Sequence, residues 1–144
     1  MSEESSYGQA RIGKFDNQTA ERLLVKEWHG DRNWQIEPGD PLEPSNLVVP
    51  WYSQMNIIPR GQHIKCTLIP SGRFVRIFEN KGKVHVTRWV DDEYNPAVPY
   101  NFAPDKYTVL FKEDGVRVYR YGQTEGTEDA GEFIPYGTAE EDEA

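Results

Sequence analysis

Three histidines and a single cysteine are the residues in this sequence best suited to binding a metal ion. His63 and Cys66 form the closest pair, but residues three apart on a strand point to opposite faces, so a shared ion would require a bulge. His29 and His85 do not complete the site by their spacing. We therefore expect no metal and no cofactor, and Cys66 is interpreted as a small buried hydrophobic residue.

Acidic residues cluster where they could bind calcium or transfer protons. In residues 31–37, side chains that carry oxygen atoms occur at every second position, as in a calcium-binding loop. The sixth position of such a loop must be glycine for the chain to turn, but here it is Ile36. Asp91, Asp92 and Glu93 end a predicted strand, where carboxylates usually face solvent. The chain also has no glycine-rich phosphate loop and no nucleophile elbow. We expect a protein that is not an enzyme.

Residues 62–121 predict the β core, because short β-rich runs alternate there with turn residues. Residues 63–69, 74–79 and 84–90 predict a three-stranded meander, with a turn over 70–73. Residues 107–112 and 116–121 predict a hairpin across the Asp-Gly turn at 113–115. The two-residue period of strands places Val84 and Val86 on one face and His85 and Thr87 on the other. The predicted fold is all-β, a small barrel or sandwich of about five antiparallel strands.

Residues 1–61 are predicted to form an N-terminal arm and a proline-rich docking segment. Residues 1–16 have too few apolar side chains to fold alone, and residues 19–28 predict a short helix, with a strand as the alternative. Five prolines between residues 31 and 60 oppose both a helix and a central strand. That segment is nevertheless too apolar for a free linker, so we expect it to lie on the β core or on a neighbouring subunit.

Charge divides the chain into a basic centre and an acidic end. Residues 122–144 contain eight acidic residues and no basic residue, and they are predicted to form a flexible acidic tail. Between Arg60 and Val90 seven basic residues accompany the single acid Glu79. This asymmetry favours either an anionic partner for the meander or an association of the tail with it.

We weigh three functions from different classes. The first is a structural or interaction protein that docks onto protein subunits of a large assembly, with a virion accessory protein as the favoured example and homo-oligomers included. The second is a single-strand nucleic-acid-binding protein with a barrel like an OB fold and a regulatory acidic tail. The third is a small carbohydrate-binding module or enzyme that uses Trp51, Tyr52, Tyr94 and Tyr100.

Candidate residues follow from the first two functions. The predicted partner-binding residues are aromatic or apolar and lie outside the β core or in the tail: Tyr7, Phe15, Trp51, Tyr52, Met55, Phe133 and Tyr136. The predicted nucleic-acid contacts are basic or aromatic and lie in the meander: Arg73, Arg76, Lys81, Lys83, Arg88 and Trp89. No apolar run reaches the length of about 20 residues that spans a bilayer. We expect no membrane partner, synthesis in a cytoplasm and, in the first case, a place in an assembled virus particle.

Overall fold

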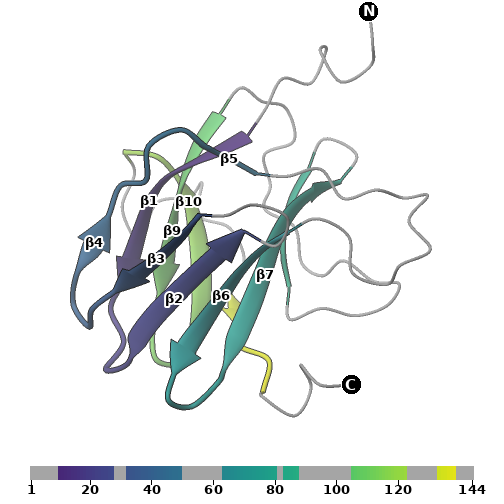
Figure 1. The fold of residues 1–144 in the computed structure, drawn as a ribbon. Helices are drawn as coiled ribbons and strands as arrows, with labels where there is room; N and C mark the ends of the chain where they lie inside the picture. The colour runs from purple at the N-terminus through teal and green to yellow at the C-terminus, as the bar shows by residue number, and fades with distance from the viewer. Residues whose placement is uncertain are drawn as a thin grey trace, which may run out of the picture.

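The chain folds as a β-sandwich of two facing sheets, as Figure 1 shows for the computed structural model. The structure describes residues 10–27, 32–49, 63–80, 83–87, 105–122 and 133–138. Every regular element in these ranges is a strand. Each sheet ends in edge strands and does not close on itself, which resolves the choice between barrel and sandwich. The all-β prediction is confirmed.

The first sheet has the order β11-β10-β9-β1-β4, and β5 also pairs with β1. Its central pair is parallel, with Ile12 of β1 beside Tyr107 of β9 and Phe15 beside Val109. The register shifts between Ile12 and Lys14, which marks a bulge in β1. The strands are β1 (Ala10–Asn17), β4 (Pro41–Leu42), β5 (Leu47–Val48), β9 (Asp105–Phe111), β10 (Gly115–Arg120) and β11 (Ile134–Pro135).

The second sheet has the order β3-β2-β6-β7-β8 and is antiparallel throughout. Val25 of β2 lies beside Cys66 of β6, and Cys66 lies beside Val75 of β7. The strands are β2 (Arg22–Glu27), β3 (Asn33–Ile36), β6 (Ile64–Ile69), β7 (Phe74–Asn80) and β8 (Lys83–Thr87).

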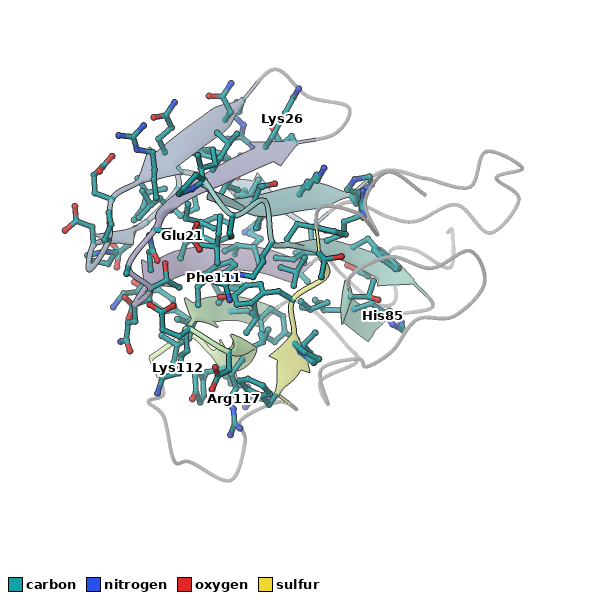
Figure 2. The ribbon with its side chains drawn as sticks, turned by 90° about the horizontal axis from the view of Figure 1, so that it is seen from below. Glu21, Lys26, His85, Phe111, Lys112 and Arg117 are labelled. Atoms are coloured by element: carbon teal, nitrogen blue, oxygen red, sulfur yellow. The ribbon has the colours of Figure 1, made fainter. Side chains whose placement is uncertain are left out.

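Alternate residues of both sheets form one core, because every second side chain of a strand points to the same face. Ile12, Phe15 and Phe111 from the first sheet meet Leu23 and other aliphatic side chains of the second. Phe15 and Phe111 are fully buried, with ring centroids 6.3 Å apart. Figure 2 shows Phe111 between the two sheets.

Both predicted strand groups are present. The meander corresponds to β6, β7 and β8, and the hairpin corresponds to β9 and β10. Across the hairpin turn, the Lys112 amide donates to the Gly115 carbonyl oxygen at 2.8 Å. In β8, Val84 and Val86 face the core and belong to its cluster, as their spacing predicts.

The structure corrects two predictions for the N-terminal third. Residues 10–16 are not an arm, because β1 pairs with β9 in the first sheet and buries Phe15. The proposed helix over residues 19–28 is replaced by β2, which was the alternative. Residues 10–49 therefore contribute to both sheets, and a boundary at residue 61 does not separate them from the core. The predicted flexible tail is corrected for residues 133–138, because β11 pairs with β10 and Tyr136 is buried. Residues 1–9, 50–62, 123–132 and 139–144 lie outside the described ranges.

Candidate functional site

Arg76, one of the predicted nucleic-acid contacts in the described part of the meander, does not lie on the surface. Arg76 is fully buried, and its Nε donates to His63 Nε2 at 3.3 Å. The guanidinium carbon also lies 4.7 Å from the ring centroid of Phe74. Phe74 and Phe78, the aromatic residues of the same strand, are fully buried as well and offer no surface on which a base could stack. The prediction that Arg76 contacts phosphate is therefore wrong.

Arg73 joins three loops at one end of the sandwich. Its Nη2 lies 2.8 Å from Glu21 Oε2, and its Nη1 donates to the Glu113 carbonyl oxygen at 2.7 Å. The Ser71 amide donates to Glu21 Oε1 at 2.7 Å, and the Ala20 amide donates to Glu113 Oε2 at the same distance. Arg73 is thus engaged within the fold.

Of the remaining predicted nucleic-acid contacts, Lys83 is described only as backbone of β8, and Lys81, Arg88 and Trp89 lie outside the described residues.

Hydrogen bonds hold the Glu21 carboxylate in its charged form. Desolvation raises the pKa of Glu21, but the hydrogen bonds from Arg73 and Ser71 and the charge of Arg73 leave it below its ordinary value. Glu79 shows the opposite case, since burial raises the pKa of its carboxyl and one hydrogen bond, from the Ala10 amide at 3.4 Å, only partly opposes that effect. Burial also raises the pKa of the Cys66 thiol, in agreement with an unreactive core residue.

The predicted partner-binding residues separate into three groups. Phe15 and Tyr136 are buried in the core, and the Tyr136 hydroxyl donates to the Lys112 carbonyl oxygen at 2.6 Å, so their assignment as partner anchors is corrected. Phe133 remains 40 % exposed. The other four lie outside the described residues: Tyr7, Trp51, Tyr52 and Met55.

Unpaired cations gather instead on the outer face of the first sheet. Arg11, Lys14, Lys106 and Arg117 all belong to this face, and Figure 2 shows Arg117 pointing away from the sandwich on the side opposite Lys26. None of the four forms an ion pair within the part of the chain that the structure describes. Leu110 and Tyr119, on the same face, are buried. The exposed parts of the face are therefore its two ends, near Lys106 and near Arg117.

A cleft opens at the Lys106 end. Arg11 of β1 and Lys106 of β9 are neighbours in the parallel register, and both side chains are exposed. The Lys106 ammonium lies 4.8 Å from the centroid of the Tyr121 ring. A Cβ atom at Gly13 would lie 2.5 Å from both Lys106 Cδ and Tyr121 Cδ1. Glycine in the bulge of β1 thus leaves the room in which the lysine stem and the tyrosine ring pack together.

The opposite wall of the cleft is the connection between β4 and β5. Glu43 Oε2 accepts a hydrogen bond from the Tyr121 hydroxyl at 2.8 Å, and this bond raises the pKa of Tyr121. Arg32 secures the far end of the connection, because its Nη1 donates to the Ser45 carbonyl oxygen at 2.9 Å. Asn46 completes the turn with a φ of 54°. The cleft encloses about 360 Å³, within the lower part of the range for small-ligand sites.

Sequence reasoning missed this cleft entirely. The sequence places Arg11 in a predicted arm and Tyr121 at the end of a predicted hairpin, and Lys106 lies just before that hairpin. The parallel pairing of β1 with β9 brings Arg11 and Lys106 together. Two parallel strands are not joined by a short turn, so the sequence contains no turn residues that would indicate their pairing. The only local signal is Gly13 inside an alternating run, which is typical of a bulge.

Other kinds of site find no support in the described ranges. Within them, no three His, Cys, Asp or Glu side chains gather closely enough to hold a metal ion. The same residues include no helix of the length and apolar character needed to cross a membrane. No protein-family model matches the sequence, and neither a curated protein nor a solved structure matches it significantly.

Proposed function

We propose that this protein is a non-enzymatic interaction protein that docks onto another protein subunit of a larger assembly. Its docking surface is the outer face of the first sheet, with Phe133 and Arg117 at one end. The observation that supports this most is the exposure of Phe133, a large aromatic side chain held in a fixed place on the surface. The burial of Arg76 disfavours the alternative of a nucleic-acid partner for the meander.

The surroundings of Phe133 support the docking role. Gly115 of β10 lies directly beneath the ring, since a Cβ atom there would be 2.7 Å from Phe133 Cζ. The guanidinium carbon of Arg117 lies 5.8 Å from the ring centroid. Aromatic residues and arginine are enriched at protein interfaces, whereas most surface side chains contribute little to binding. A half-exposed ring placed beside an arginine is thus a suitable anchor for a partner.

The kind of assembly is proposed from the sequence. A small β core with a polar N-terminal segment, an apolar proline-rich segment and an acidic end is an architecture common among accessory proteins of virus particles, so a virion is the assembly we favour.

Sedimentation tests the docking role. A tagged chain is expressed in the cell from which the gene comes, and the lysate is separated on a density gradient. We expect the wild-type chain in fractions much heavier than its own 16.6 kDa. Replacing Phe133 with serine should lower the heavy fraction about tenfold or more, the effect of losing an interface anchor.

Ile69 provides a matched control. It is 41 % exposed, similar to Phe133, but it belongs to β6 in the second sheet. Ile69→Ser should leave the heavy fraction unchanged. A wild-type chain found only at the position of a free monomer would contradict the proposal, and so would equal losses for both variants.

A further inference from the structure

Arg11 and Lys106 place two positive charges side by side with nothing in the described structure to neutralise them. Their Cα atoms are register partners across β1 and β9, and like charges directly opposite each other destabilise a sheet. Arg22, Arg32 and Arg73 elsewhere on the surface each have a carboxylate within 3.0 Å. Glu43 is the one acidic residue among those that line the cleft. Its carboxylate accepts a hydrogen bond from the Tyr121 hydroxyl and forms no ion pair with Arg11 or Lys106.

The cleft is also organised around these cations before any ligand arrives. The Lys106 stem packs over Gly13 and its ammonium lies against the Tyr121 ring, which is fixed by the hydrogen bond to Glu43. A cation held in this way loses less side-chain entropy when an anion binds. The geometry suits one compact anionic group seated between Arg11 and Lys106.

A carboxylate from a protein fits this site better than a nucleic acid. A nucleic-acid backbone requires a continuous track of cations, whereas Glu43 lines the cleft and Asp16 lies farther along β1 on the same face. The whole chain also has a formal charge of −8, which repels a polyanion at long range. A single carboxylate on a peptide needs only the local pair of cations.

We propose that this cleft binds an aspartate or glutamate side chain within an acidic segment of the partner protein, held between Arg11 and Lys106. The inference rests on the proposed docking function and identifies the chemistry of the partner. Phe133 and the cleft lie toward opposite ends of β10, so one partner would contact an aromatic anchor at one end and place its carboxylate at the other.

Titration of the full chain with model peptides, followed by amide nuclear magnetic resonance, tests the site. Pentaglutamate should shift the amide signals of Arg11, Gly13, Lys106 and Tyr121, and pentaglutamine should not. Arg11→Gln and Lys106→Gln should each weaken binding about fivefold, the scale of an exposed ion pair. Lys26→Gln, on the opposite side of the molecule, is the control and should change nothing.

The competing ligands are tested in the same way. Inorganic phosphate should bind the cleft at least about fivefold more weakly than pentaglutamate at the same ionic strength, because it has no peptide to contact the walls of the cleft. Oligothymidylate should also bind at least about fivefold more weakly, because the cleft lacks the continuous track of cations that a nucleic-acid backbone needs. Equal binding of oligothymidylate, equal binding of phosphate, or shifts confined to other parts of the chain would overturn the inference. Circular dichroism of each variant confirms that the fold is retained.

Failure of this inference can be separated from failure of the docking function. If the Arg11→Gln, Lys106→Gln double variant sediments with the assembly as well as wild type does, the cleft is not used by the partner, while the Phe133 result still tests docking. If pentaglutamate binds the cleft but the wild-type chain never enters heavy fractions, the docking function is wrong and the carboxylate site stands.

Discussion

At the scale of single residues, Glu79 shows how burial sets the properties of one carboxyl group. It is 2 % exposed near the end of β7, and among the described residues its carboxylate accepts a hydrogen bond only from the Ala10 amide. Burial disfavours the charged form and raises its pKa. When folding raises the pKa of a group, the contribution of that group to the free energy of unfolding is fully present at pH values below its unfolded pKa, here about 4.5. This contribution is lost as the pH rises through the folded pKa.

Replacing Glu79 with glutamine should therefore raise the melting temperature at pH 7, because the glutamine side chain carries no charge that folding must bury. Its amide oxygen can still accept the hydrogen bond from the Ala10 amide. The advantage over wild type should shrink as the pH falls toward about 4.5, where the carboxyl becomes protonated in both states. Thermal unfolding followed by circular dichroism at both pH values measures this. Glu37→Gln is the control, because its carboxylate is exposed and its surface ion pair with Arg22 contributes little to stability. A lower melting temperature for Glu79→Gln at pH 7 would refute the assignment.

At the scale of elements, β1 determines how the N-terminal third joins the core. The strand pairs with β9, β4 and β5, and its Phe15 side chain is fully buried against Phe111. Phe15→Ala should lower the free energy of unfolding by about 3–5 kcal/mol, as expected for a cavity left by a core phenylalanine. Urea denaturation gives the value. A loss below about 0.5 kcal/mol would indicate that the strand is a dispensable arm.

The loops joined by Arg73 make a second prediction at this scale. Glu21 has a lowered pKa, so its contribution is present above its unfolded pKa of about 4.5 and is lost as the pH falls through the folded pKa. Arg73→Ala should lower the free energy of unfolding at pH 7 by about 1 kcal/mol, since the ion pair is partly exposed. The difference from wild type should narrow in acid. A difference that is the same at pH 7 and pH 3 would show that Arg73 acts without Glu21.

The elements also show what could be predicted from the sequence. Hairpins are signalled by neighbouring strands with turn residues between them, so β6, β7 and β8 and the pair β9 and β10 were predicted correctly. The short strands β4 and β5 were missed because Pro38, Pro41 and Pro44 appeared to exclude strands. Both occur at the edge of the first sheet, where proline is tolerated.

The candidate cleft could not be predicted for a related reason. Its cations come from β1 and β9, which are far apart in sequence, and its wall comes from the connection between β4 and β5. The basic run between Arg60 and Val90 favours a basic surface on the second sheet, since composition does not reveal that Arg76 is buried or that Arg73 is paired. Phe133 is a candidate from the sequence alone, because an apolar residue among acidic ones is visible without knowledge of strand pairing.

At the scale of the whole molecule, the protein combines an acidic chain with a local basic surface. The formal charge of −8 acts at long range, but it is screened beyond about 8 Å at physiological ionic strength. In our proposal the exposed pair of Arg11 and Lys106 acts at contact distance and selects the group that binds in the cleft. The central claim is therefore that the first sheet, rather than the second, faces the partner.

Acetylation of lysines in the free and the assembled chain tests this claim most directly. Lys106 and Lys26 are both exposed and lie on the outer sides of different sheets, so each reports whether its own face is covered. Mass spectrometry after brief acetylation measures their rates of modification. We predict that assembly slows acetylation of Lys106 several-fold and leaves that of Lys26 unchanged. Equal rates for Lys106 in both states, or protection of Lys26 in its place, would contradict the account.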